Sequence, residues 1–227
     1  MHRDTGTDST YDFSMGLLGE FRRDLRVVLW SEERLIYIRV PKCGNTSISR
    51  AIPEGQKCRI SIRRLKRLYP GWLAFSFVRN PWDRLVSTYH QKVDLENANP
   101  EMMIDGVYRG FRERHLPVRP DMSFEAFAKL VCSIPDSKTD KHLRSQTSFL
   151  VRDGRLVVDV VGKLERVDED WKIITHKAGA SAVLPHLNRT RHKPYSGYYR
   201  DPRILSLVAD RYREDIDRFG YEAPSGG

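Results

Sequence analysis

The chain has 227 residues, of which 40% are hydrophobic and 30% charged, and its formal net charge is +9 at pH 7. That length suits one sizeable α/β domain and is short for two, and the composition is that of a soluble globular protein. No run of about eighteen apolar residues and no basic-then-apolar leader occurs, so we expect neither a membrane-spanning helix nor an export signal. The surplus of positive charge favours an anionic ligand or acceptor.

The cysteines are few and widely spaced, and no Cys-x-x-Cys pair occurs among Cys43, Cys58 and Cys132. They indicate a reducing compartment and argue against a disulfide or metal framework. We expect a partly flexible N-terminal segment over residues 1–25, a single domain over 26–221 and a tail over 222–227. A first strand is predicted around residues 26–30.

The first informative stretch follows the apolar run Leu35–Val40, which has the length of a buried strand. A turn-prone segment comes next, and Thr46 and Ser47 open an amphipathic piece that we predict as a short helix ending near Ile52. A strand, a tight loop and a helix N-terminus aim backbone N–H groups and the positive end of the helix dipole at one spot, which attracts an anion. Lys42 adds a full positive charge there. The stretch predicts a phosphate cradle, with an ordinary strand-to-helix turn as the alternative.

The next stretch, residues 57–68, alternates basic and apolar residues. It fits a helix whose charged face is solvated, and contact of that face with an acidic acceptor or with phosphate is the alternative.

A second strand-to-helix turn follows the apolar run Leu73–Val78. Asn80 is a good helix cap and a proline comes after it, so a helix starts directly after Arg79. Ser87 lies about six residues into this helix, roughly 9 Å along its axis. The long Arg79 side chain and the Ser87 hydroxyl can therefore share one phosphate, and an ion pair of Arg79 with Asp83 is the alternative.

Neither turn matches the magnesium-dependent nucleotide loops. In those loops Gly-Lys-Ser/Thr ends the turn, whereas here Lys42 leads it and no Gly-Lys pair precedes Thr46. A kinase or hydrolase would also place an acidic residue at such a strand end to hold magnesium, and this chain has Arg79. We therefore predict an anion site without a metal.

Both turns resemble motifs of the sulfotransferases. Val40–Ser47 resembles the loop that holds the 5′-phosphosulfate, and Phe77–Tyr89 resembles the motif that holds the 3′-phosphate. The closest resemblance is to the carbohydrate-type sulfotransferase family 2, whose donor is 3′-phosphoadenosine 5′-phosphosulfate (PAPS). Later segments agree, and the resemblance covers roughly residues 34–221, although 95–139 match poorly. These later segments are Asp140–Gln146, Val161–Glu165, Glu169–Trp171, His186–Thr190 and Asp215–Tyr221.

The resemblance implies an α/β fold, a P-loop-like (nucleotide-kinase-like) three-layer sandwich with a central parallel sheet. It implies metal-free, in-line transfer of a sulfuryl group from PAPS to a hydroxyl, with the adenosine bisphosphate PAP as product. Lys42 is the candidate for stabilising the leaving phosphate, and Arg79 and Ser87 are the candidates for the 3′-phosphate. The 5′ end would be cradled by Pro41, Lys42, Cys43, Gly44, Asn45, Thr46 and Ser47.

A general base must reach the acceptor hydroxyl and titrate near neutral pH, which favours histidine. His142, within the resembling segment, is the first candidate and His90, close after Ser87 on the predicted helix, is the second. A basic, aromatic loop at 189–200 could close over the nucleotide with Arg191 or Lys193 on phosphate, and an RNA-contacting surface is its alternative.

Other segments are predicted from composition alone. Residues 95–120 form a lid or an acceptor-binding loop, with disorder as the alternative. A core helix is predicted over 122–131, a strand over 157–164 and a helix around 169–178. Glu165 between them fits a structural ion pair better than catalysis.

Two rival functions stay open at this point: a metal-dependent P-loop phosphotransferase and a basic nucleic-acid-binding protein. The expected acceptor is a carbohydrate, possibly an acidic polysaccharide, and a lipid-linked sugar or a small alcohol would fit the same pattern. We expect no nucleic-acid or membrane partner, and the sequence does not predict the oligomeric state. The expected location is the cytoplasm of a bacterial-type cell, with a Golgi-lumen catalytic domain lacking its anchor as the alternative.

Overall fold

A computed structural model describes residues 25–120, 122–185 and 194–224. Its central sheet has five strands in the order β3-β1-β2-β4-β9. These strands are β1 (Leu25–Trp30), β2 (Leu35–Ile38), β3 (Gln56–Ile60), β4 (Leu73–Val78) and β9 (Val160–Lys163). Within the described residues, none of the helices is both long and apolar enough to cross a bilayer.

The sheet is mixed, which corrects the predicted parallel sheet. β2, β4 and β9 are parallel neighbours, but β1 pairs antiparallel with both β2 and β3. The reason is the short turn between Trp30 and Leu35, because a connection of a few residues can join only antiparallel strands. The α/β class is as predicted.

Two of the longer helices begin directly after a residue whose side chain caps the helix. Asn80 caps α3 by accepting from the amides of Trp82 and Asp83, and Ser123 caps α5 through the amide of Ala126. The helices are α1 (Asn45–Ile48), α2 (Ile62–Leu68), α3 (Pro81–Lys92), α4 (Arg109–Arg112), α5 (Phe124–Ser133), α6 (Thr147–Leu150), α7 (Val167–Ala178), α8 (Pro202–Arg211) and α9 (Arg213–Phe219). The short elements are β5 (Met103–Ile104), β6 (Val107–Tyr108), β7 (Val151–Arg152), β8 (Arg155–Leu156) and the 3₁₀ turns Pro100–Met102, Leu164–Arg166 and Tyr195–Tyr198.

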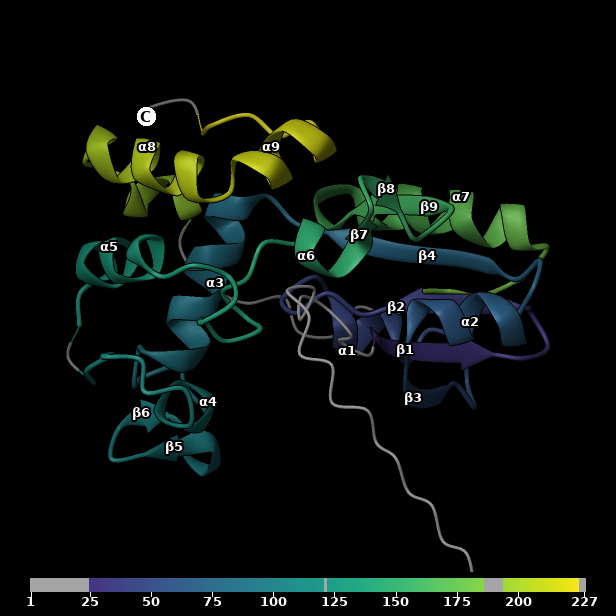
Figure 1. Ribbon diagram of the computed structural model, residues 1–227, viewed down its shortest axis with the longest axis horizontal. Coiled ribbons are helices and arrows are strands. Elements are labelled where there is room, and N and C mark those ends of the chain that lie inside the picture. Colours follow the sequence, from purple (N-terminus) through teal and green to yellow (C-terminus); the bar gives the residue numbers. More distant parts are fainter. Residues whose placement is uncertain (1–24, 121, 186–193, 225–227) are drawn as a thin grey trace, which may run out of the picture.

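Two hydrophobic clusters hold the chain together. The first lies on the sheet, where the rings of Tyr37 and Phe75 stack at 5.2 Å and Trp171 of α7 meets Phe75 edge-on. The second joins α3, α5 and α8, with Trp82 and Phe127 buried between them. Figure 1 shows the sheet on one side of the molecule and these helices on the other, beside the end of β4 that leads into α3.

The segment 95–120 is folded, so its predicted alternative of disorder is wrong. It contains the β5–β6 hairpin and α4, which lie together at the far end of α3 from α8 (Figure 1). Tyr108 and Phe111 are buried in the second cluster and anchor the hairpin to α3. No structural feature identifies the segment as a lid.

Candidate active site

A cavity of about 980 Å³ opens at the carboxyl ends of β2, β4 and β9, beside α3. Open α/β sheets bind ligands at this edge, because loops and helix starts converge there. The lining includes residues from both motif turns and from the later resembling segments. Among them are Arg26, Arg39, Pro41, Lys42, Gly44, Asn45, Thr46, Ser47, Arg79, Asp83, Ser87, Gln91, Lys141, His142 and Glu165.

The first turn is tightly constrained. Lys42 and Gly44 both have φ of 74°, in the left-handed region, which is uncommon for a lysine and is held only when the surrounding structure fixes it. A Cβ atom at Gly44 would lie 2.8 Å from the Cδ1 atom of Leu164, so a side chain there would displace Leu164, and the positive φ would strain any residue but glycine. The helix that follows, α1, is a single turn starting at Asn45, which is shorter than predicted and weakens the expected dipole contribution. Side chains must therefore supply most of the positive charge.

The second turn places Arg79 at the end of β4. Its Nε atom lies 2.8 Å from the Oδ2 atom of Asp83, which is the ion pair expected as the alternative to phosphate binding. Both residues also line the cavity, together with Ser87 one turn further along α3. Ion pairing and ligand binding are therefore compatible at Arg79.

The two turns are joined directly. The Nη1 atom of Arg79 donates to the carbonyl oxygen of Lys42 at 3.4 Å. Gln146 also links them: its Oε1 atom accepts from the Arg79 amide at 2.8 Å and from the Cys43 thiol at 3.1 Å. The lysine-led and arginine-led turns thus face one cavity, as a single ligand with two anionic groups would require.

The electrostatics of the cavity fit an anion. The pKa of Lys42 is lowered to about 6, first by burial and then by repulsion from the neighbouring Arg79, Lys92 and Arg84. Such crowding of cations makes the charged lysine unfavourable until a negative group is added. The cavity therefore favours an anionic ligand, and phosphate groups would fit this requirement.

His142 forms a pair with a carboxylate at the cavity wall. Its Nδ1 atom lies 2.5 Å from the Oδ1 atom of Asp140, which also accepts from the His142 amide at 2.9 Å. The pKa of His142 is lowered to about 4, because burial and the charges of Lys92 and Lys141 outweigh the opposing effect of Asp140. Asp140 is buried, yet the hydrogen bonds and charge of His142 keep the pKa of its carboxyl below the usual value. A neutral His142 that donates from Nδ1 leaves Nε2 able to accept a proton.

Some predicted site residues lie elsewhere. His90 does not line the cavity; its ring nitrogens lie 2.8 Å from Asp94 Oδ2 and 2.6 Å from the Tyr198 hydroxyl, within the helical cluster. Cys43 is fully buried and does not line the cavity. Arg191 and Lys193 lie outside the described residues.

Several residues that shape the site were missed. Arg84 is buried on α3 and donates to the carbonyl oxygens of Pro41 at 3.0 Å and Arg144 at 2.6 Å. These hydrogen bonds fix the first turn against α3. Glu165, expected in an ion pair, instead accepts from the Asn80 amide at 2.5 Å through Oε1. The signal for Gln146 and Asp140 was present, because both belong to the segment that resembles the sulfotransferases.

Fold and cavity together define an α/β protein with a cationic cleft at the carboxyl edge of its sheet. The chain belongs to the sulfotransferase family: the family's sequence model matches residues 26–222. The resemblance to the carbohydrate-type family 2 is thereby confirmed.

A curated relative agrees with this assignment. The chain is similar to carbohydrate sulfotransferase 14 of Danio rerio, with 21% identity over an alignment 231 positions long, gaps included. The alignment covers 88% of this chain. The matched region spans 63% of the length of that relative. No solved structure matches the chain significantly.

Proposed function

We propose that this protein transfers a sulfuryl group from PAPS to a hydroxyl group of a carbohydrate. The observation that carries the proposal is the meeting of the two motif turns at one cavity, with Arg79 Nη1 hydrogen-bonded to the Lys42 carbonyl oxygen. PAPS carries negative groups at its 5′ and 3′ ends, and each turn supplies cations for one of them. Family membership supports the sulfuryl donor, and the name of the similar zebrafish protein supports a carbohydrate acceptor.

The positions of the residues in the two turns support a role for each of them in donor binding. The turn 41–47 would hold the 5′-phosphosulfate with its backbone amides and hydroxyls, and Arg79 and Ser87 would hold the 3′-phosphate. Lys42, at the head of the turn, would neutralise the charge that develops on the 5′-phosphate as it leaves. The P-loop-like layering of this family remains part of the proposal.

The chemistry is an in-line displacement. The acceptor oxygen forms a bond to sulfur while the bond between sulfur and the bridging phosphate oxygen breaks, and the hydroxyl proton passes to Nε2 of His142. Asp140 holds the Nδ1 proton and stabilises the imidazolium that forms. The pKa of His142, about 4, describes the cavity without its anions, and the negative charge of the donor would raise it towards the working range.

Calorimetric titration with PAP tests the donor, with Lys42→Met as the site variant and the exposed Lys57→Met as its control. We expect micromolar binding to the wild type and to K57M, unchanged by EDTA, and roughly tenfold or weaker binding to K42M, as for loss of one charged hydrogen bond. Binding of ATP only with magnesium would instead support a phosphotransferase. Salt-sensitive binding of an oligonucleotide in preference to PAP would support a nucleic-acid-binding protein.

A further inference from the structure

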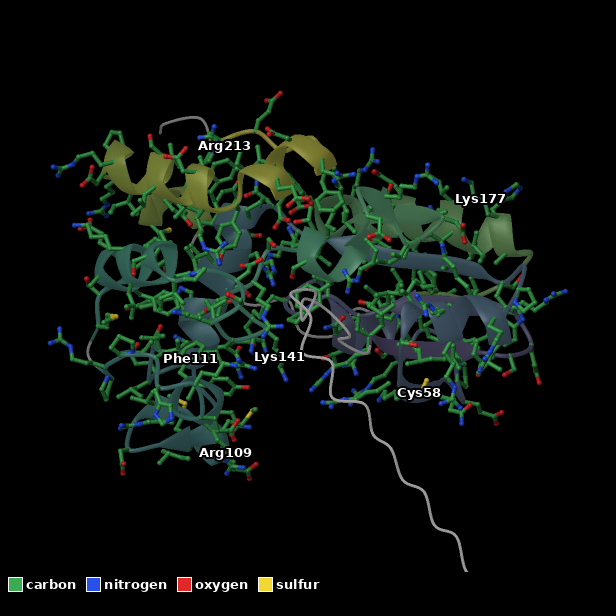
Figure 2. All side chains as sticks on the ribbon, viewed as in Figure 1. Cys58, Arg109, Phe111, Lys141, Lys177 and Arg213 are labelled. Carbon is green, nitrogen blue, oxygen red and sulfur yellow. The ribbon has the colours of Figure 1, made fainter. Side chains whose placement is uncertain are left out.

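The β5–β6 hairpin contacts the proposed base through one tyrosine. Tyr108, the last residue of β6, is 6% exposed, and its ring meets the His142 imidazole edge-on with 5.5 Å between the ring centroids. The Lys92 Nζ atom lies 3.8 Å from the centroid of the same ring, and the Phe111 ring meets it edge-on at 5.2 Å. In Figure 2, Phe111 lies on the helical side of the molecule, and Lys141, the chain neighbour of His142, lies between that side and the sheet. The Tyr108 ring is thus a fixed surface against which the imidazole packs.

Gly110 brings the start of α4 close to the carboxylate that orients His142. A Cβ atom at Gly110 would lie 2.6 Å from Cε1 of Tyr108 and 3.1 Å from Oδ2 of Asp140. The packing there leaves no room for a side chain between the tyrosine ring and the carboxylate. The other carboxylate oxygen, Oδ1, accepts from the backbone amide and from Nδ1 of His142. Asp140 is therefore confined by His142 on one side and by the backbone of α4 on the other.

The orientation of the His142 ring decides whether it can act as a base. The terminal torsion of a histidine side chain has a broad energy profile, so a loosely held ring can turn and exchange the places of its two nitrogens. In this structure Nδ1 donates to Asp140 Oδ1 at 2.5 Å, which leaves Nε2 as the acceptor. The arrangement persists only if neither the ring nor the carboxylate can move. Tyr108 restricts the ring, and the backbone at Gly110 restricts the carboxylate.

We propose that Tyr108 and Gly110 are positioning residues for sulfuryl transfer, which hold His142 and Asp140 in the geometry that leaves Nε2 free to take the acceptor proton. The inference rests on the proposed function and adds two residues that act through the base and not on the donor. Neither of them lines the described part of the cavity. Both lie within residues 95–139, where the resemblance to the family motifs is poor. The folded segment that carries them thereby supports the base.

The first test compares two glycines that have equally little space. A Cβ atom at Gly55 would lie 2.5 Å from Nε1 of Trp30, in the first hydrophobic cluster, and neither Gly55 nor Gly110 has a positive φ. Gly110→Ala and Gly55→Ala each add one methyl group to a tightly packed place, so both should lower the melting temperature. Only G110A should change His142. We expect nitrogen NMR of its imidazole to show a mixture of tautomers, and kcat to fall about tenfold to hundredfold with PAP affinity within about twofold.

A second pair of variants separates the ring of Tyr108 from its hydroxyl. Tyr108→Leu removes the ring that touches His142, and Tyr108→Phe supplies the ring without the hydroxyl. We expect Y108L to show the tautomer mixture and the loss of kcat, and Y108F to recover the wild-type values of both, because the contact is made by the ring. This pair tests the proposal even if G110A does not fold.

PAP binding separates this proposal from the proposed function. All the variants should bind PAP as the wild type does, and failure of the wild type to bind PAP would overturn the proposed function, while the tautomer data would still report on Tyr108 and Gly110. A single, unchanged tautomer in both G110A and Y108L, or a tautomer change of the same size in G55A, would overturn the positioning role. So would a loss of PAP affinity in G110A as large as its loss of kcat, because the effect would then not be confined to the base.

Discussion

The side chain of Gln146 pairs with the backbone of Arg79 in both directions. Its Oε1 atom accepts from the Arg79 amide and its Nε2 atom donates to the Arg79 carbonyl oxygen, each at 2.8 Å. The same Oε1 atom accepts from the Cys43 thiol, so one fully buried amide holds the two anion-binding turns in register. Asp215 fixes Gln146 in turn by accepting from its backbone amide at 2.7 Å. Preorganisation of the cavity thus depends on a residue that would never touch the ligand.

Gln146→Glu tests this dependence. The substitution keeps Oε1 but replaces the donor with an oxygen that faces the Arg79 carbonyl, which leaves buried groups unsatisfied at a cost of about 1–3 kcal/mol in unfolding free energy. We expect chemical denaturation to show that loss, and PAP affinity to fall as well because the turns lose their register. Gln56→Glu, at an exposed position on β3, should change neither quantity. Normal PAP affinity in a destabilised Q146E protein would show that the pair supports folding only.

Lys42 makes ligand binding depend on pH. Its pKa of about 6 lies well below the usual 10.5 because of burial and the nearby arginines, and bound phosphate groups should raise it. Above pH 6 the lysine must therefore take up a proton when PAP binds. Titration calorimetry at pH 7.5 in buffers of different ionisation enthalpy should show uptake of up to one proton, absent in K42M and retained in K57M. Identical heats in all buffers for the wild type would contradict this coupling.

The lowered pKa of Lys42 also makes the free energy of unfolding depend on pH. A lysine whose pKa is lowered on folding binds more protons in the unfolded chain, so unfolding free energy rises with pH between about 6 and 10.5. K42M should lose this dependence and be more stable than the unliganded wild type near pH 7, as urea denaturation across pH would show. Greater stability of the wild type at pH 7 would mean that the lysine is already paired.

Local chemistry made the two turns predictable. A buried strand, a turn-prone segment and a helix cap lie within a few residues of each other, so the apolar run before Arg79 and the cap at Asn80 were sufficient to place α3 correctly. Family resemblance then indicated that both turns serve one ligand. The position of His142 beside Asp140 also follows from a spacing of two residues.

What could not be predicted depends on contacts distant in sequence. The antiparallel β1 was missed as a partner of β2, and with it the alignment of Arg26 with Arg39 and Arg59. Every residue of β1 except Arg26 is buried, and a continuous buried run does not reveal the direction of a strand. The position of His90 outside the cavity could not be predicted either, because its ring contacts the Tyr198 hydroxyl, which lies 108 positions away in the chain. Likewise the tie between Gln146 and Cys43 joins residues 103 positions apart.

His142 and Asp140 should affect turnover and not donor binding. His142→Ala removes the proposed base and should lower kcat about 10²- to 10⁴-fold, the usual contribution of a general base, with PAP affinity within about twofold. Asp140→Asn should lower kcat less and lower the pKa of His142 further, because the carboxylate raises it. Sulfate incorporation into a glycan panel measures the first effect and an NMR titration of the imidazole measures the second. His115→Ala, at an exposed position, is the matched control, and wild-type turnover in H142A would exclude the assigned base.

Lys92 contributes to the low pKa of His142. Its buried Nζ atom lies 3.8 Å from the centroid of the Tyr108 ring, whose own centroid is 5.5 Å from that of His142. The ammonium repels the imidazolium and so contributes to the low pKa of His142, after burial. Lys92→Met keeps the apolar length without the charge, so the pKa of His142 should rise, and the acid limb of the kcat profile should move to higher pH. Titration of the imidazole by NMR measures this pKa without any need for turnover. Lys57→Met, the control, should leave the pKa of His142 unchanged. A fall in the pKa of His142 in K92M would show that Lys92 acts through packing and not through its charge.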